Sequence, residues 1–450
     1  MTNDAKRETV KLADMEPKFR GRAVGIIIVL LILMFLNSSA ASDSINVITS
    51  YFPETFGWSD TQVALPQTIG SLISIPLLAL AAVFYHKFST LHVLRVSFLI
   101  QGICVILIGV TCGHYWGYAT AAIVVRMCST VNQFGTYKLC TDWFNSWRGR
   151  ILGIVTIAGP ISSASTAGVL TAGNAVLGFS TTFVVFGIVV LVLCVASTFI
   201  SKSYPEDYGL AVDGVVRTPE ELAALDGDVN SPSIWTLKAM IRTKEYWIVT
   251  FAIAFFAMAM SGTMQMWIRI TVMGKGLDMG IAIVALSIGS LLGIPISMIS
   301  GVIDDKFGTN KAAFFVWMFM IVLMLCMIFI TPACAWLVYV ATFCVGAVTG
   351  CFPNINPSIK AYTFGRKAFV TANSVSAMIE NLFMSGALIF LSIISDLTGS
   401  FTPAYVIHVI ITAIFAVLLL TIKPMAPEVI GVEAAKEIVK RATEPRHKGS

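Results

Sequence analysis

The sequence predicts an all-α, polytopic membrane protein with twelve transmembrane helices arranged as two six-helix halves. The first observation is composition: 56% of the 450 residues are hydrophobic and 12% are charged, whereas about 25% of residues are charged in a soluble domain. The second is that apolar runs long enough to cross a bilayer recur along the chain. The third is a repeat, because IGSLISIPLLALAAVFYHKFSTLH at 69–92 returns as IGSLLGIPISMISGVIDDKFGTNK at 288–311 with 10 of 24 positions identical. Such a repeat indicates two related halves.

Twelve spans of about 20 or more residues fit the sequence, and each can cross a hydrocarbon core of about 30 Å. The expected spans are 23–49, 60–84, 92–112, 117–139, 149–173, 177–200, 246–272, 279–303, 312–331, 335–360, 369–394 and 402–422. The corresponding domains are a cytoplasmic N-terminal tail (1–22), an N-terminal six-helix half (23–200), a cytoplasmic middle loop (201–245), a C-terminal six-helix half (246–422) and a cytoplasmic C-terminal tail (423–450). The mixed charges before the first span favour an uncleaved helix over a signal peptide.

Lysine and arginine residues gather in alternate turns, and this asymmetry sets the expected orientation. They lie in both tails, in the middle loop and in the turns after spans two, four, eight and ten, whereas the other turns contain only Lys275. We therefore expect both termini in the cytoplasm and a multi-pass protein of the inner (plasma) membrane that works as a monomer. Residues 235–244 combine apolar and basic side chains in the pattern of an amphipathic helix on the inner surface.

Several kinds of chemistry are excluded by missing motifs. The sequence has no G-x-x-x-x-G-K-[ST] loop for nucleotide, no metal-ligand cluster and no G-x-S-x-G nucleophile turn. The net charge of +5 is spread over the expected cytoplasmic turns and gives no reason to expect nucleic acid. The nine cysteines lie mostly in apolar runs, which is typical of buried free thiols. We expect neither an enzyme nor a bound metal or cofactor.

The turn after the eighth span carries the motif G-x-x-x-D-K-F-G-x-x-K, from Gly301 through Asp305 and Lys306 to Lys311. With twelve spans and a long middle loop, this motif resembles the major facilitator superfamily, as does Arg126 in the fourth span. The resemblance implies secondary transport by alternating access between the halves. It implies gating roles for Asp305 and Lys306, and for Arg148 and Arg150 in the turn after span four. The first-half copy has His86 in place of the aspartate, so we expect inward opening to depend more on Asp305.

Two further turns, 143–154 and 357–367, resemble those of carboxylate carriers within that superfamily. The resemblance extends weakly to the oxalate:formate-exchanger-like branch, which has a basic residue in span eleven where this chain has Glu380. It implies an organic anion as the solute.

Two charged residues lie deep in spans of the first half. A charge at the bilayer centre costs about 2.5–3.5 kcal/mol, so such residues face the interior and find partners. Asp43 lies ~10 Å and Arg126 ~14 Å from the outer ends of their helices, so we expect them to approach each other. In one interpretation Arg126 binds a substrate carboxylate and Asp43 exchanges a proton. In the other they form a permanent ion pair that holds two helices together.

The second half offers a corresponding set. Arg269, beside Gln265 near the outer end of span seven, is either an anion ligand or a side chain that reaches the outer surface. Glu380 in span eleven is a candidate proton-coupling group, or a neutral acid bonded to a neighbouring helix. Asn354 and Asn356 lie next to Pro353 and Pro357 in span ten, where we expect a broken helix with carbonyls open to a cavity. Lys360, at the inner end of that span, is expected to extend to the surface.

The sequence therefore favours a secondary active transporter for a small organic anion, coupled to protons or to a counter-anion, in the lipid bilayer. One alternative is proton-driven efflux of amphipathic drugs or cations, for which Asp43 and Glu380 are suitable. Another is a membrane sensor that binds a solute without moving it.

Overall fold

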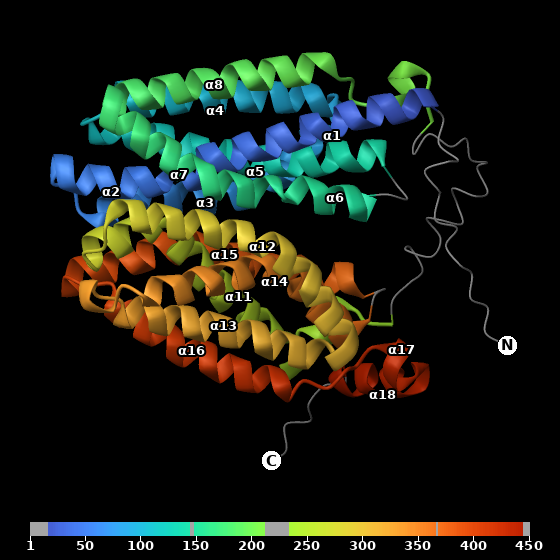
Figure 1. The fold of residues 1–450 in the computed structure, drawn as a ribbon. Coiled ribbons are helices and arrows are strands. Elements are labelled where there is room, and N and C mark those ends of the chain that lie inside the picture. The colour runs from blue at the N-terminus through green and yellow to red at the C-terminus, as the bar shows by residue number, and fades with distance from the viewer. Residues whose placement is uncertain (1–16, 145–147, 212–233, 366–367, 444–450) are drawn as a thin grey trace. The chain divides into compact units, whose positions relative to one another are not determined.

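The computed structural model describes residues 17–144, 148–211, 234–365 and 368–443, and these residues form helices (Figure 1). The first part of the chain contains α1 (Pro17–Ser38), the π-helical segment η2 (Ser39–Asp43), α2 (Ile45–Phe56), α3 (Asp60–Lys87), α4 (Thr90–Val110), α5 (Tyr115–Trp143), α6 (Arg148–Thr156), α7 (Ala158–Leu177), α8 (Phe179–Ile200) and η3 (Pro205–Tyr208). The second contains α10 (Leu237–Met240), α11 (Lys244–Gln265), the π-helical segment η5 (Arg269–Gly274), α12 (Met279–Phe307), α13 (Thr309–Phe329), η6 (Pro332–Cys334), α14 (Leu337–Phe364), α15 (Phe369–Thr398), α16 (Thr402–Leu420), α17 (Pro427–Ile430) and α18 (Val432–Thr443).

Ten helical stretches among the described residues are long and apolar enough to cross a membrane, which confirms the all-helical membrane class. The two other predicted spans correspond to α3 and α5, which have 28 and 29 residues and are long enough to span. Polar residues such as Arg126, Gln133 and Lys138 lower the apolar character of α5. A helix that carries its polar groups inside a bundle is less apolar than one that faces lipid, so α5 is an expected exception.

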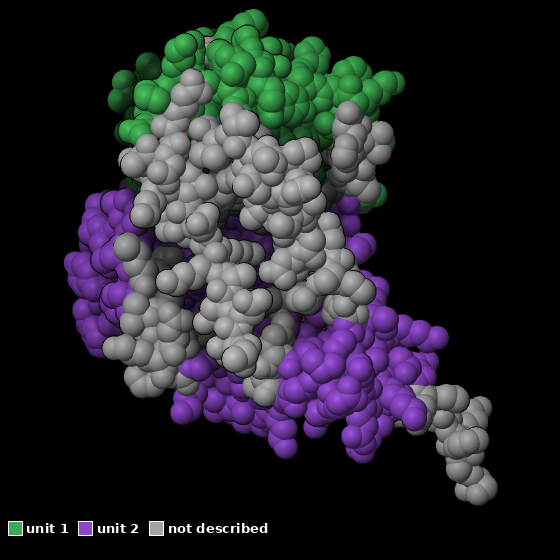
Figure 2. Space-filling model, turned by 90° about the vertical axis from the view of Figure 1, so that its right-hand side faces the viewer, with its two compact units in different colours: residues 1–44, 76–222 green, residues 45–75, 223–450 purple. Residues whose placement is uncertain are grey.

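The chain divides into two compact units, residues 1–44 with 76–222 and residues 45–75 with 223–450 (Figure 2). One boundary between the units falls between residues 222 and 223, in the middle loop, and the predicted halves stay a prediction. The segment 45–75, which contains α2 and the first part of α3, belongs to the second unit. The sequence repeat assigns 45–75 to the first half, whereas these residues pack with the second unit, so that assignment stays a prediction.

In the second unit, α12 and α14 approach each other through glycines. A Cβ atom built on Gly350 would lie 2.2 Å from the carbonyl oxygen of Gly293, and one on Gly346 would lie 2.9 Å from that of Gly289. Small residues at a membrane helix interface let backbones approach closely, and van der Waals contact then stabilises the pair. The repeat residues Gly289 and Gly293 therefore fix the packing of α12.

The turns of the two repeat copies differ in backbone conformation. Gly308, before α13, has a φ of +85°, which favours glycine. The aligned residue Ser89, before α4, has a φ of −62°. The first-half turn therefore follows a different path, consistent with its departure from the motif.

The end of the middle loop is packed into the protein. Trp235 is 1% exposed in a cluster that contains Tyr246, Phe364 and Met425, and its Nε1 donates to the carbonyl oxygen of Met425 at 3.2 Å. Side chains of α18 pack against the same cluster. The expected surface helix is wrong in one respect, because α10 is a single turn and the side chain of Trp235 is buried in protein. Phe364 of α14, Met425 and side chains of α18 pack in this cluster.

Candidate functional site

The first helix contains a π-helical turn, η2, from Ser39 to Asp43. The backbone N–H of Ser44 donates to the carbonyl oxygen of Ser39 at 3.0 Å, five residues back instead of four. Single π-helical turns inside α-helices occur frequently at functional sites. Here the wider turn ends at Asp43, the one acidic residue of the segment 39–43.

Asp43 is 7% exposed, and both of its carboxylate oxygens accept hydrogen bonds from α7. Ser163 Oγ donates at 2.8 Å to Oδ1, and Ser162 Oγ donates to Oδ2. Ser162 also bonds to Ser39 of η2 at 2.8 Å. Hydroxyl donors stabilise a carboxylate in its ionised form. Two serines of α7 are therefore the direct partners of this acid.

Arg126 reaches η2 from α5. Its Nη1 donates to the carbonyl oxygen of Ala41 at 2.7 Å and lies 3.3 Å from Ser42 Oγ. The structure thus brings Arg126 and Asp43 to the same π-helical turn, as the sequence suggests. The hydrogen bonds of Arg126 described above run to Ala41 and Ser42, whereas the Asp43 oxygens accept from two serine hydroxyls.

Three buried amides lie in the same unit and connect α1, α4 and α5. Gln101 Nε2 lies 3.5 Å from Asn37 Oδ1, and Asn132 Nδ2 donates to Gln101 Oε1 at 2.8 Å. All three side chains are at most 4% exposed. Buried polar side chains are normally hydrogen-bonded, so these three amides hold α4 and α5 against α1, the helix that leads into η2. Sequence analysis missed it because the partners are 31 and 64 residues apart.

The second unit contains a cluster around Glu380 of α15. Asn356 Nδ2 donates to Glu380 Oε1 at 2.9 Å and to Oε2 at 3.2 Å, and Lys360 Nζ lies 3.6 Å from Oε2. Lys360 also donates to Asn373 Oδ1 at 2.7 Å. The residue Lys360 is only 2% exposed, so the expectation that it extends to the surface is wrong. A carboxylate and a neighbouring amide on α15 give its ammonium group partners inside the bundle.

The helix break expected near Pro353 and Pro357 is also wrong. Helix α14 continues from Leu337 to Phe364 with both prolines inside it, and Asn354 and Asn356 lie on this continuous helix. Proline removes one N–H donor but membrane helices tolerate it where neighbours compensate. The side-chain amide of Asn356, rather than a free backbone carbonyl, is what meets Glu380.

Arg269 opens η5 and lies between two carboxylates. Its Nε donates to Asp60 Oδ1 at 2.9 Å and its Nη1 to Glu54 Oε1 at 2.8 Å. Asp396 of α15 accepts from the backbone N–H groups of Asp60 and Thr61 at 3.1 and 2.9 Å. These residues, which we call the clasp, join the end of α2 and the start of α3 to η5 and α15 within the second unit. Arg269 is thus bound to protein carboxylates, and its predicted role as an anion ligand stays a prediction.

Gln265 ends α11 four residues before Arg269. Its Nε2 donates to Ser261 Oγ at 2.6 Å, while its Oε1 is buried and has no hydrogen-bond partner among the described residues. The predicted binding role of Gln265 therefore has an available acceptor but stays a prediction.

Lys275, the basic residue in the expected outer turns, donates hydrogen bonds to two other segments of the second unit. Its Nζ donates to the carbonyl oxygen of Ile328 at 2.9 Å and to Thr402 Oγ1 at 3.0 Å. Partial burial lowers the pKa of Lys275 below its ordinary value. It therefore ties the end of α13 to the start of α16, which explains a lysine at the side with few basic residues.

Residues 26–385 match the family model described as Major Facilitator Superfamily. The chain belongs to the major facilitator superfamily. Among solved structures it is similar to the nucleoside transporter NupG, with 11% identity, 88% of this chain and 99% of that chain covered, and a TM-score of 0.69. It is also similar to a bacterial homologue of the human lysosomal transporter Spinster. That structure, inward-facing and unoccupied, has 12% identity, 96% and 100% coverage and a TM-score of 0.62. Its occupied form has 13% identity, 94% and 97% coverage and a TM-score of 0.61. A search of curated proteins found no match.

Membership in the superfamily confirms the predicted class: the protein is a secondary transporter that binds a small-molecule substrate, and it is not an enzyme. The structural similarities, at these identities, establish the fold alone. The predicted branch, solute, membrane and orientation stay predictions.

The predicted gating residues of the superfamily motifs lie at helix ends. Asp305 and Lys306 occupy the last turn of α12, and Arg148 and Arg150 the first turn of α6. Their side chains lie outside the described part of the chain, so their gating roles stay predictions.

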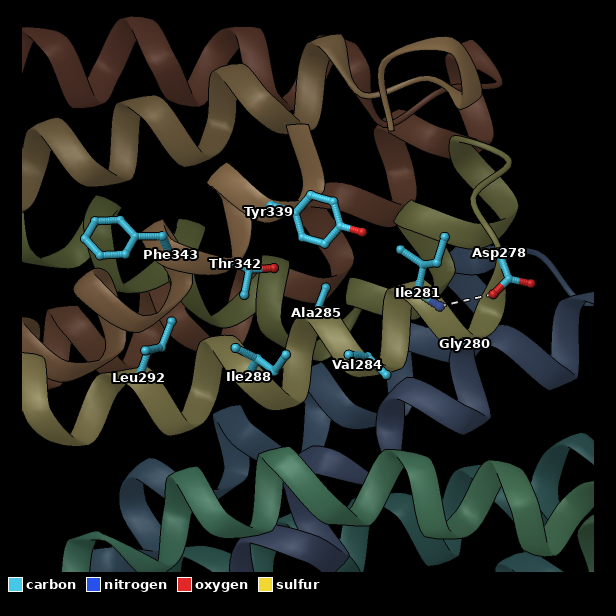
Figure 3. Close-up of a pocket in the computed structure, with 10 residues that line it drawn as sticks. All are labelled: Asp278, Gly280, Ile281, Val284, Ala285, Ile288, Leu292, Tyr339, Thr342 and Phe343. Carbon is cyan, nitrogen blue, oxygen red and sulfur yellow. Dashed lines mark hydrogen bonds between the residues drawn. The ribbon is translucent and has the colours of Figure 1, made fainter. Parts of the chain in front are cut away.

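A groove of about 490 Å³ lies between α12 and α14 (Figure 3). Figure 3 shows Ile281, Val284 and Ile288 on α12 facing Tyr339 and Phe343 of α14 across it. These five side chains are 39% to 68% exposed. Most of the side chains that line this groove are apolar, so it offers few hydrogen-bonding groups to a polar solute.

Proposed function

We propose that the protein carries a small organic anion, with a carboxylate as the recognised group, and couples this to protons or to a counter-anion. The observation that supports the proposal is that Arg126 and Asp43 meet the same π-helical turn but have different partners. Asp43 accepts from two serines, while Arg126 donates to the neutral oxygens of Ala41 and Ser42. A guanidinium that donates to neutral oxygens can exchange them for a carboxylate, which it binds in two places.

Asp43 supplies the switch in this proposal. A proton on Asp43 removes a negative charge next to the arriving anion, and its loss after release restores the resting arrangement. Glu380 has the same function in the second unit. Asn354, Asn356, Gln265 and Arg269 are proposed to contact the solute during the cycle, and Asp305, Lys306, Arg148 and Arg150 to form the gates.

Accumulation of labelled carboxylates in proteoliposomes under an imposed pH gradient tests this function. Removing a charged hydrogen-bonding group costs about 1.5–3 kcal/mol, which is about 10- to 150-fold in affinity. We expect Arg126→Gln to lose that much and Asp43→Asn to bind but no longer respond to the gradient. Arg95→Gln is the matched control, because Arg95 donates to the carbonyl of Thr198 and lies over the ring of Phe199. A loss of equal size in Arg95→Gln would contradict the assignment.

Proton-driven efflux of cations is the second candidate, favoured by the buried carboxylate of Asp43 and the partly buried carboxylate of Glu380. Export of a cationic dye that survives Arg126→Gln but is abolished by Asp43→Asn would establish it in place of the first. A sensor would bind a solute without any accumulation in the same vesicles.

A further inference from the structure

The cluster around Lys360 holds an ammonium group that is only loosely paired. Lys360 Nζ has a hydrogen bond of 2.7 Å to the neutral amide oxygen of Asn373. Its distance to Glu380 Oε2, 3.6 Å, is an ion-pair contact longer than a hydrogen bond. An ammonium group has three N–H donors, and a carboxylate is its strongest acceptor. Because the Glu380 carboxylate lies beyond hydrogen-bond distance, this ion pair is weaker than a hydrogen-bonded one.

Asn356 adds a hydrogen-bond acceptor to the cluster. Asn356 and Lys360 are four residues apart and therefore lie on one face of α14. The Oδ1 atom of Asn356 is buried and has no hydrogen-bond partner among the described residues, while its Nδ2 atom holds Glu380. A buried acceptor without a donor is uncommon in folded proteins. It is satisfied when an O–H or N–H group enters the cluster.

The Glu380 carboxylate completes the arrangement. Its side chain is 13% exposed, compared with 3% for Lys360. The Glu380 carboxylate contacts the charged Lys360 and the neutral amide of Asn356. Glu380 is thus the internal anion of Lys360, and it is the more accessible member of the pair.

We propose that Lys360 is an anion-binding residue for a small carboxylate that also carries a hydroxyl or amide donor. The solute carboxylate replaces Glu380 on the Lys360 ammonium group, and the solute donor bonds to Asn356 Oδ1. Glu380 takes one proton from water as it is displaced, so the cluster keeps one positive and one negative charge. This inference rests on the proposed anion transport and assigns it one proton for each solute carboxylate bound.

Thermal unfolding of the purified full-length protein with paired probes tests the inference. The pairs are lactate with propionate, malate with succinate, and glycerate with 3-hydroxypropionate, which differ by one hydroxyl. We expect at least one hydroxycarboxylate to raise the melting temperature more than its partner. The rise disappears in Lys360→Gln and shrinks to that of the partner probe in Asn356→Leu. In Glu380→Gln the rise remains but no longer increases as the pH falls.

Controls separate this inference from the proposed function. Lys360→Arg keeps the charge and should keep ligand stabilisation, and Lys360→Gln combined with Glu380→Gln removes the pair without leaving a buried charge, so folding is retained. Lys138→Gln is the matched control, because Lys138 bonds to Asp142 at 2.8 Å on α5. Stabilisation that persists in Lys360→Gln but is lost in Arg126→Gln overturns the inference and leaves anion transport standing. Absence of stabilisation by every hydroxycarboxylate overturns the inference, while accumulation of a labelled carboxylate in proteoliposomes would still leave anion transport standing.

Discussion

The exposed fractions of the clasp side chains predict how much each ion pair contributes to the stability of the protein. The Asp60 side chain is 5% exposed and Arg269 is 15% exposed, whereas Glu54 is 55% exposed. Removing one partner of a buried ion pair costs about 3–5 kcal/mol because the other charge is left uncompensated. An exposed pair contributes about 0.2–1 kcal/mol. We therefore expect Arg269→Gln to destabilise the protein several times more than Glu54→Gln.

Thermal unfolding of purified variants in a single detergent measures the difference. The double variant Asp60→Asn with Arg269→Gln tests the coupling, because it removes both charges together. We expect it to be more stable than Arg269→Gln alone, with a coupling of about 0.5–3 kcal/mol in the double-mutant cycle. Two results would refute the reasoning: a loss in Glu54→Gln as large as that in Arg269→Gln, or a double variant whose loss equals the sum of the singles.

Four other substitutions have expected outcomes in the same unfolding measurement. Gly350→Ala should destabilise by about 1–3 kcal/mol or more, since its Cβ would lie 2.2 Å from the Gly293 carbonyl. By contrast Gly386→Ala, with no atom within 4 Å of its Cβ, should be neutral or up to about 1 kcal/mol stabilising. Trp235→Ala should cost about 3–5 kcal/mol, and a loss below 1 kcal/mol would show that its cluster does not anchor the middle loop. Lys275→Met should cost about 0.5–1.5 kcal/mol for each of its two hydrogen bonds, and no measurable loss would contradict its role as a tie.

The class of fold was readable from the sequence because long apolar runs have few alternatives in a bilayer. The repeat and the motif ending at Lys311 predicted the superfamily, which the family match confirms. The helix α5 was predicted as a span although it contains Arg126, because enough apolar residues flank that arginine. Each of these features can be read directly from one stretch of sequence or, for the repeat, from the comparison of two.

Partner identity was less accessible. Position near a helix end suggested that Lys360 reaches the surface, but the carboxylate of Glu380 lies 20 residues later on another helix. Arg269 likewise meets Asp60 from 209 residues away. The prolines of α14 failed as helix breakers for a related reason, since tertiary packing decides whether the helix continues. The choice among such partners depends on how helices pack, and one sequence does not contain that information.

The π-helical turn η2 changes how the first helix should be numbered. A π-helical turn is equivalent to one extra residue, and each residue of an α-helix adds about 100° of rotation. Positions in α2 are therefore rotated by about that angle relative to a helical wheel drawn through α1. A face assigned to residues 17–38 cannot be extended to 45–56 by periodicity. Asn46 of α2 donates to the carbonyl oxygen of Met264 at 3.0 Å, in the last turn of α11, and accepts from the N–H of Ile268, just after that helix. The side of α2 that meets other helices therefore follows from the contacts of residues 45–56 themselves, and the apolar pattern of α1 does not predict it.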